Sequence, residues 1–161
     1  MITGRGARAR QVAVCGPREC TDAERVAARQ VGALLARAGV VVLCGGGSGV
    51  MAAVVEGARS AGGLAVGIRP GDDLDDAAPG LSAVIATGMG EARNAVLVRS
   101  ADAVIVIGGS WGTLSELALA RRLGIPVVGL RSWTVLDADG RPLPDAVPVA
   151  TSPAEAVRRA L

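Results

Sequence analysis

Short apolar runs alternate along this chain with segments of amphipathic helical pattern, and this alternation constrains the fold more than any other feature. The runs are continuously apolar and several end in glycine, which is typical of strands buried on both faces. Strands separated by helices pair in parallel, and a parallel sheet needs helices on both of its faces. The sequence therefore predicts an α/β fold, a single doubly wound domain with a mainly parallel sheet of about six to seven strands.

The expected elements follow from these runs and from the glycine, proline and capping residues between them. Strands are expected over residues 11–15, 40–44, 64–68, 82–87, 103–107 and 126–130, and near residue 147. Helices are expected over residues 22–38, 50–60, 91–100, 114–123 and from residue 153 to the C-terminus. A hairpin around Asp139 and Gly140 is expected within residues 133–149. Residues 11–161 then form one domain, and residues 1–10 form a mobile N-terminal arm.

The chain contains neither His nor Lys, and this excludes several kinds of chemistry. A Ser-His-Asp triad and a His-ligated metal are impossible without His, and a Schiff base with pyridoxal phosphate is impossible without Lys. The aspartates of the loop at residues 72–76 are interpreted as solvated side chains, so we expect neither a metal site nor a cofactor. The available chemistry is that of carboxylate, guanidinium, hydroxyl and thiol groups and of the backbone.

Composition also restricts the partners and the location of the protein. Phe and Tyr are absent and the net charge is only +2, which argues against a nucleic-acid partner. No apolar stretch reaches about 18 residues, so no membrane partner is expected. The N-terminus resembles no secretory signal and the three cysteines are an odd number, which favours a cytoplasmic location.

Three glycine-bearing turns follow expected strand ends, at residues 16–18, 45–49 and 108–112. Ligands of open parallel sheets bind beyond the carboxyl ends of the strands, and the N–H groups at the start of a following helix suit an anion. The first turn is interpreted as structural. The other two are predicted to bind a phosphate or nucleotide through Gly45, Gly46, Gly47, Gly49, Gly108, Gly109, Ser110, Gly112 and Thr113.

Glu116 allows two interpretations from its spacing alone. The segment Thr113-Leu-Ser-Glu116 has the pattern of a capping box, in which the glutamate bonds back to the first residue of its own helix. The same carboxylate, expected in the first turn of the helix, lies beside the predicted phosphate turn and is therefore also a candidate catalytic group. Arg93, taken by itself, fits an arginine on a helix surface.

Taken together, these residues resemble the Lonely-guy (LOG) family, whose members were long mislabelled as lysine decarboxylases. The similar segments are Gly45-Gly-Gly-Ser-Gly-Val-Met51, Arg93-Asn94, Ser100-Ala-Asp-Ala103 and Gly109-Ser-Trp-Gly-Thr-Leu-Ser-Glu116. The resemblance extends over residues 11 to 160 and implies a Rossmann-like fold and a homo-oligomer, a dimer or a tetramer. It also implies hydrolysis of the N-glycosidic bond of a nucleoside 5′-monophosphate to a free base and ribose 5-phosphate. Lysine decarboxylation is excluded because the chain has no Lys.

The resemblance implies catalytic roles for Arg93 and Glu116. Candidate contacts to the base or ribose are Asn94, Trp111 and Met89. The family's motif of Pro-Gly-Gly-x-Gly-Thr-x-x-Glu is altered here, with Gly108 in place of its Pro and Ser110 in place of its second Gly. Asn94 stands where the family has a Lys. These departures resemble the branch that contains unassigned bacterial proteins and molybdenum-cofactor carriers.

Three functions are consistent with this pattern. The favoured one is a phosphoribohydrolase acting on a small-molecule nucleotide. The alternative is a binding or carrier protein for a phosphate-bearing ligand, either molybdenum cofactor or a signalling nucleotide. The third is an oligomeric scaffold with a vestigial pocket.

Overall fold

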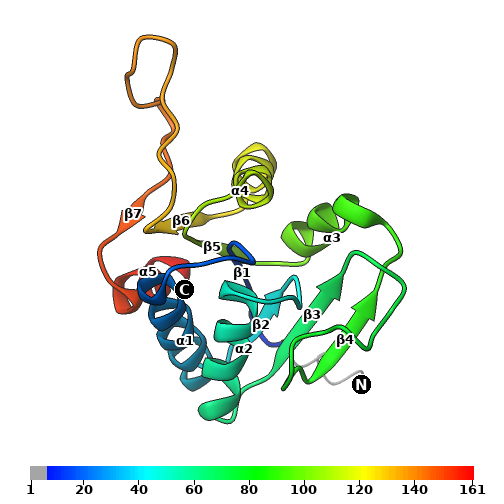
Figure 1. The fold of residues 1–161 in the computed structure, drawn as a ribbon. Coiled ribbons are helices and arrows are strands. Elements are labelled where there is room, and N and C mark those ends of the chain that lie inside the picture. Colours follow the sequence, from blue (N-terminus) through cyan, green and yellow to red (C-terminus); the bar gives the residue numbers. More distant parts are fainter. Residues whose placement is uncertain (1–6) are drawn as a thin grey trace, which may run out of the picture.

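Seven parallel strands form one sheet in the computed structural model, which describes residues 7–161 (Figure 1). The strands lie in the order β4-β3-β2-β1-β5-β6-β7. They are β1 Gln11–Cys15, β2 Val41–Cys44, β3 Ala65–Arg69, β4 Ala83–Ala86, β5 Ala103–Ile107, β6 Val127–Leu130 and β7 Val149–Ala150. The helices are α1 Asp22–Arg37, α2 Val50–Ser60, α3 Arg93–Arg99, α4 Trp111–Leu123 and α5 Pro153–Ala160, with a 3₁₀ helix η1 at Gly90–Ala92. The predicted α/β class and strand number are confirmed.

The strand order reverses between β1 and β5, and this reversal positions the site. From β1 the chain proceeds outward through β2 and β3 to β4, whereas β5, β6 and β7 extend the sheet on the other side of β1. The loops that follow β1 and β5 therefore lead to helices on opposite faces of the sheet. Such a divergence opens a crevice beyond the carboxyl ends of the two strands, where doubly wound folds bind their ligands.

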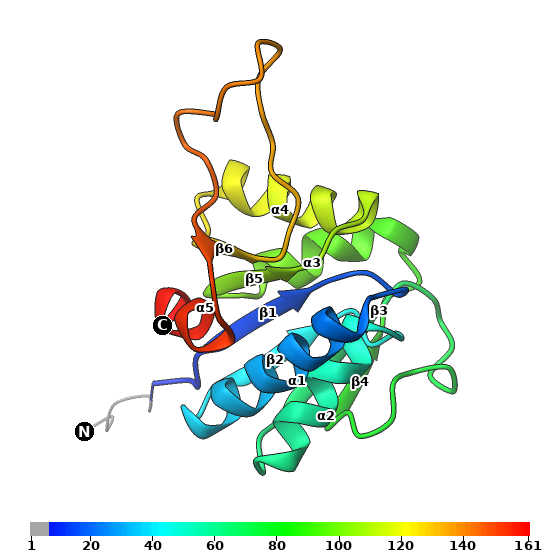
Figure 2. The ribbon, with the colours of Figure 1, turned by 60° about the vertical axis from the view of Figure 1, so that its left-hand side comes forward.

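Helices cover both faces of the sheet (Figure 2), and a hydrophobic cluster fills the space between the sheet and the helices on each face. Val12 and Val14 of β1 pack with residues of α1, α2 and α5 in one cluster. Ala13 and Cys15 of the same strand pack with residues of α3 and α4 in the other. The alternation along β1 thus directs the Cys15 side chain, at the carboxyl end of the strand, toward the face that carries α4.

The start of α4 differs from the expectation. The helix begins at Trp111 instead of residue 114, because Ser110 acts as the N-cap and its hydroxyl accepts the N–H of Thr113 at 3.1 Å. Serine caps a helix as well as threonine does, so the sequence allowed either position. The capping box between Thr113 and Glu116 is therefore wrong, and Glu116 lies in the second turn of α4 instead of the first.

Smaller corrections concern the remaining boundaries. The helix expected over residues 91–100 is divided into the short η1 and α3, and the strand expected near residue 147 is β7, Val149–Ala150. The hairpin is confirmed, since Leu136 and Pro142 form an antiparallel bridge and the N–H of Gly140 donates to the carbonyl of Asp137 at 3.1 Å. The segment between β6 and β7 projects well away from the sheet (Figure 1).

The predicted N-terminal arm, residues 1–10, lies partly outside the described residues. Within the described part, Arg8 forms a salt bridge with Asp102 at 2.6 Å, and Arg10 donates to the carbonyl of Ala160 at 2.9 Å. None of the helices in residues 7–161 combines the length and apolar character that a membrane crossing requires.

Candidate functional site

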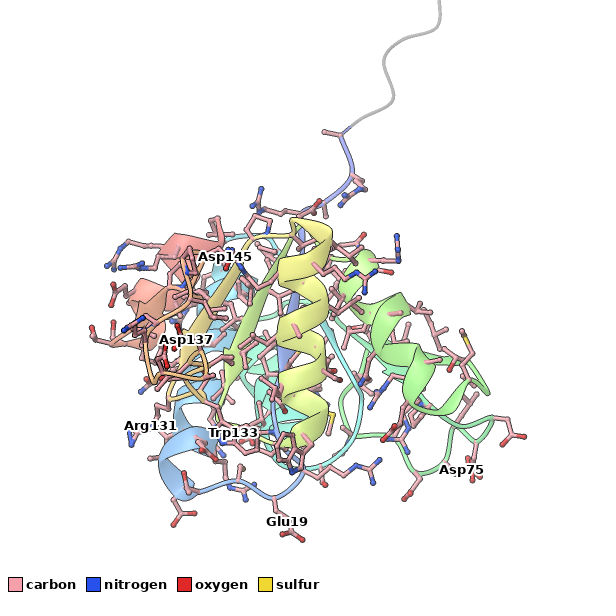
Figure 3. All side chains as sticks on the ribbon, turned by 90° about the horizontal axis from the view of Figure 1, so that it is seen from above. Glu19, Asp75, Arg131, Trp133, Asp137 and Asp145 are labelled. Atoms are coloured by element: carbon pink, nitrogen blue, oxygen red, sulfur yellow. The ribbon has the colours of Figure 1, made fainter. Side chains whose placement is uncertain are left out.

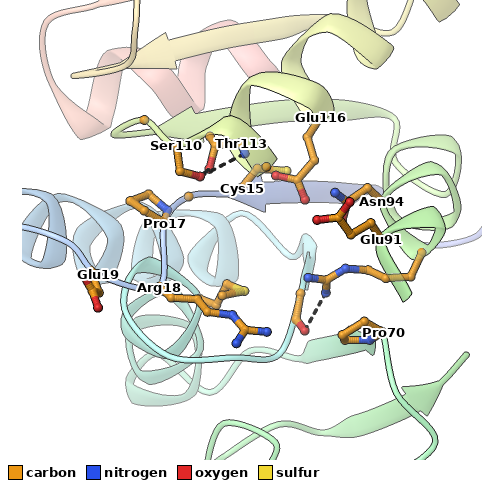
Figure 4. Close-up of a pocket in the computed structure, with 16 residues that line it drawn as sticks. Cys15, Pro17, Arg18, Glu19, Pro70, Glu91, Asn94, Ser110, Thr113 and Glu116 are labelled. Carbon is orange, nitrogen blue, oxygen red and sulfur yellow. Dashed lines mark hydrogen bonds between the residues drawn. The ribbon is translucent and has the colours of Figure 1, made fainter. Parts of the chain in front are cut away.

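A cavity of about 520 Å³ lies beyond the carboxyl ends of β1 and β5, at the point where the strand order reverses (Figure 4). The loops after β1, β2, β3 and β5 line it, together with the beginnings of α3 and α4. The lining residues are Cys15, Gly16, Pro17, Arg18, Glu19, Gly45, Met51, Pro70, Glu91, Arg93, Asn94, Gly109, Ser110, Gly112, Thr113 and Glu116.

One wall of the cavity is the N-terminal turn of α4. The Ser110 hydroxyl accepts the N–H of Thr113 and shares a 2.9 Å hydrogen bond with the Thr113 hydroxyl. The N–H groups of Trp111 and Gly112, at the first two helical positions, have no acceptor within the helix. Together with the positive end of the helix dipole, these groups form a site suited to a phosphate.

The turn that precedes this wall requires glycine at two positions, Gly108 for its backbone conformation and Gly109 for close packing. Gly108 adopts a φ of +68°, a conformation that L residues with side chains rarely adopt. A Cβ atom on Gly109 would overlap the indole nitrogen of Trp133. Trp133 in turn contacts Trp111 edge to face, with the two ring centroids 5.3 Å apart. The glycines of this turn therefore allow a tryptophan from the β6–β7 segment to lie directly against the backbone of the cavity wall.

Glu116 is the one acidic residue of the cavity lining that is buried, with 7% of its surface exposed. Its carboxylate points into the cavity from α4, beside the Cys15 thiol (Figure 4). Burial raises the pKa of Glu116 to about 7, although the Arg93 charge and the Cys15 thiol each act to lower it. The carboxyl therefore exchanges its proton near neutral pH, which is a property of groups that take part in proton transfer.

Arg93 faces Glu116 from the first position of α3. Its Nη1 atom donates to the carbonyl of Gly45 at 2.8 Å and to the carbonyl of Ile68 at 2.6 Å. These bonds connect the ends of β2 and β3 to α3 and hold the guanidinium in one orientation. Burial lowers the pKa of Arg93, and the Glu116 charge opposes this shift. Arg93 is therefore a fixed, partly buried cation at the site and not an arginine of the helix surface.

The Cys15 thiol provides a prediction about the acidity of Glu116. In a Cys15→Ala variant the pKa of Glu116 should rise, because an interaction that favours the ionised carboxylate is lost while the carboxyl stays buried. The measurement is a pH titration of the glutamate side-chain carbons by ¹³C NMR. Cys20→Ala, which removes a thiol that does not line the cavity, serves as the matched control. An unchanged or lowered pKa in the Cys15 variant would show that the thiol does not favour the carboxylate.

The structure brings together eight of the residues singled out in the sequence. Arg93 and Glu116 line the cavity with Gly45, Asn94, Gly109, Ser110, Gly112 and Thr113. The ligand contacts of these residues stay predictions.

The other six residues lie outside the cavity lining. They are Gly46, Gly47, Gly49, Gly108, Met89 and Trp111. A Cβ on Gly49 would overlap the carbonyl oxygens of Pro17 and Arg18, so this glycine permits a close approach of two loops. Met89 is half exposed, and Trp111 is 79% exposed and packs against Trp133. Figure 3 shows Trp133 beside the N-terminal end of α4.

Sequence reasoning missed the contribution of the first turn. Cys15, Gly16, Pro17, Arg18 and Glu19 all line the cavity, although the turn was interpreted as structural. Its position directly after a buried strand was the available indication. What the sequence alone did not supply was that β1 and β5 are neighbours, which places the first and third turns at one crevice.

Comparison with known proteins gives a consistent set of similarities. A family model described as the SLOG cluster4 family matches residues 9–157. An uncharacterized protein of Archaeoglobus fulgidus is 43% identical over 129 residues, which cover 79% of this chain and 83% of that protein. The structure of the molybdenum cofactor binding protein of Rippkaea orientalis has a TM-score of 0.84 and 33% identity, covering 95% of this chain and 96% of the other. A probable cytokinin riboside 5′-monophosphate phosphoribohydrolase of Oryza sativa subsp. japonica is 38% identical over 96 residues, 58% of this chain but only 39% of that protein.

Proposed function

The chain belongs to the SLOG cluster4 family, and from this membership and the chemistry of the cavity we propose that it hydrolyses the N-glycosidic bond of a nucleoside 5′-monophosphate. The observation that carries the proposal is the buried carboxyl of Glu116, which faces a 520 Å³ cavity beside a fixed guanidinium. A site that only carried an anionic ligand would have no need of a buried carboxyl that titrates near neutral pH.

The 5′-phosphate would bind at the N-terminus of α4. The N–H groups of Trp111 and Gly112 and the hydroxyls of Ser110 and Thr113 are hydrogen-bonding groups at the positive end of the helix. This placement uses backbone and hydroxyl groups alone, so it does not depend on the Lys that the chain lacks.

The remaining lining residues would act on the sugar and the base. Ionised Glu116 would stabilise the positive charge that develops on the ribose as the N-glycosidic bond breaks, and would accept a proton from the attacking water. Arg93 would orient the nucleotide and stabilise the departing base. Asn94 lines the cavity and its Oδ1 atom has no hydrogen-bond partner in residues 7–161, so a rotation of the side chain would let it accept a hydrogen bond from the ribose or the base.

Binding and carriage without turnover is the second candidate function. It is supported by the whole-chain similarity to the Rippkaea orientalis protein, whereas the similarity to the plant phosphoribohydrolase covers a smaller part of both chains. The cargo would be a phosphate-bearing pterin such as molybdenum cofactor, held by the same phosphate wall. Asn94 in place of the family's Lys also favours this candidate.

The test is incubation of the purified protein with a panel of nucleoside 5′-monophosphates, including modified adenines, with free base measured by chromatography. We expect release of one base with ribose 5-phosphate as the second product. Absence of release from every member of the panel, for a folded protein, would reject hydrolysis. Mass spectrometry of the protein as purified then identifies any phosphate-bearing cargo that stays bound.

A further inference from the structure

Arg18 is one of the two arginines that line the cavity. Its side chain extends into the cavity from the loop after β1 (Figure 4). Among residues 7–161 its guanidinium forms neither a hydrogen bond nor a salt bridge, whereas the guanidinium of Arg93 is bonded to two carbonyl oxygens. An unpartnered cation inside a cavity is available to an anionic ligand.

The backbone of the same loop is held firmly. The Pro17 carbonyl accepts the N–H of Val50 at 3.1 Å, so the loop caps the start of α2. The Arg18 carbonyl lies against Gly49, where a Cβ atom would overlap it. The fixed backbone of Arg18 lowers the entropic cost of binding a ligand, although the unpartnered side chain still has to be ordered.

The charges near Arg18 favour the arrival of an anion. Arg18 and Arg69 both act to lower the pKa of Arg93, so positive charges from the loop after β1, the end of β3 and the start of α3 lie near one another. Arg69 donates to the Gly46 carbonyl at 3.1 Å and approaches Asp76 at 4.0 Å.

The acidic groups of the cavity lining are Glu19, Glu91 and Glu116. Glu116 is buried beside Arg93, and the other two are exposed, so solvent screens their charges. No carboxylate oxygen of these three residues lies within 4 Å of a guanidinium nitrogen of Arg18. Arg18 is itself exposed and screened by solvent, but no carboxylate within residues 7–161 pairs with it, so its charge is free to pair with an anionic ligand.

We propose that Arg18 binds the phosphate of the ligand together with the N-terminus of α4, and that it sets the preference for phosphorylated over unphosphorylated ligands. Arg18 and its neighbour Pro17 line the same cavity as Ser110 and Thr113, and the Arg18 side chain extends across the cavity away from these two residues (Figure 4), so it would turn toward the phosphate wall on binding. A guanidinium presents paired N–H donors that match two phosphate oxygens, and this geometry is specific to arginine. The inference rests on the phosphate position in the proposed function but not on hydrolysis.

The experiment is isothermal titration of wild-type protein, Arg18→Gln, Arg18→Lys and Arg25→Gln with inorganic phosphate, adenosine 5′-monophosphate and adenosine. Arg25 is exposed on α1 outside the cavity lining, so its variant controls for the change of net charge. Loss of a charge-assisted hydrogen bond should weaken binding of phosphate and of the nucleotide about tenfold or more in Arg18→Gln. Arg18→Lys should give an intermediate loss, because it keeps the charge without the paired donors. Adenosine binding should not change in any variant.

The outcomes separate this inference from the proposed function. Wild-type binding of phosphate that persists unchanged in Arg18→Gln would overturn the role of Arg18 and leave the phosphate site at α4 intact. An equal loss of adenosine and nucleotide binding would also overturn it, because Arg18 would then contact a part of the ligand other than the phosphate. Failure of the folded wild-type protein to bind either phosphate or the nucleotide would overturn both. Phosphate binding that depends on Arg18, without release of base from any nucleotide, would support the inference and reject hydrolysis.

Discussion

Replacing Glu116 by Gln is expected to abolish base release while making the protein more stable at alkaline pH. The loss of turnover should be about 10³-fold or more, because the amide can neither carry the negative charge nor accept the proton of the attacking water. The gain in stability follows from the buried position of the carboxyl, which carries a charge in wild-type protein only at the expense of its hydration.

The sign of the pH dependence can be derived from the two pKa values. The pKa of Glu116 is about 7 in the folded protein and near 4.5 in an unfolded chain, so the unfolded state releases its proton first as pH rises. The contribution of this carboxyl to stability is fully present below pH 4.5 and is lost as pH rises through 7. The difference between the two pKa values corresponds to a loss of roughly 3 kcal/mol in the free energy of unfolding above pH 8. The Glu116→Gln variant has no ionisable group at this position and therefore avoids this loss of stability.

Two measurements check this prediction. Urea unfolding at pH 5 and pH 8.5 should show that the wild-type protein loses stability between the two values and that the variant loses less. Base release should be measured on the same preparations. Glu19→Gln, which neutralises an exposed carboxylate of the cavity lining, is the matched control for the loss of one negative charge and should not reproduce the stabilisation at pH 8.5. Wild-type turnover in a folded Glu116→Gln protein would show that the carboxylate does not participate in catalysis.

Replacing Arg93 by Ala should also abolish base release, but with the opposite effect on stability. The carbonyl groups of Gly45 and Ile68 would lose their charged donor, and we expect the free energy of unfolding to fall by about 3 kcal/mol. The pKa of Glu116 should rise further, because the Arg93 charge is the larger of the two influences that lower it.

Urea unfolding and a ¹³C NMR titration of Glu116 test the Arg93 prediction. Arg99→Ala removes an exposed arginine from the last turn of the same helix and should change neither quantity appreciably. If Arg93→Ala retains wild-type stability, the two hydrogen bonds do not anchor the strand ends. If the pKa of Glu116 stays the same, the two side chains do not interact across the cavity.

The sequence predicted the framework of the fold well because its strands are buried on both faces. The strands expected at residues 11–15 and 103–107 agree with β1 and β5 residue for residue, since all their positions except Gln11 are apolar and buried. The end of the sheet was less predictable. β7 comprises two residues, one of them exposed, so its sequence carries almost no pattern.

The candidate site was harder to derive because it depends on contacts between distant segments. Local spacing could not decide whether Ser110 or Thr113 caps α4. Because Ser110 is the N-cap, Glu116 does not lie at a capping position and its carboxylate faces the cavity instead. The two carbonyl oxygens that bind Arg93 lie 48 and 25 residues before it in the chain, so no local pattern indicated them. Arg18 belongs to the site only because β5 pairs with β1.

The contact between Trp111 and Trp133 has an optical consequence. The chain contains no other aromatic residue, so its near-ultraviolet absorption and fluorescence originate almost entirely from this pair. One ring belongs to the first residue of α4, and the other lies over Gly109 at the base of the projecting hairpin. The emission of the unlabelled protein therefore reports on one corner of the molecule. A ligand that settles at the start of α4, or a movement of the hairpin, would change the spectrum without a background from the rest of the fold.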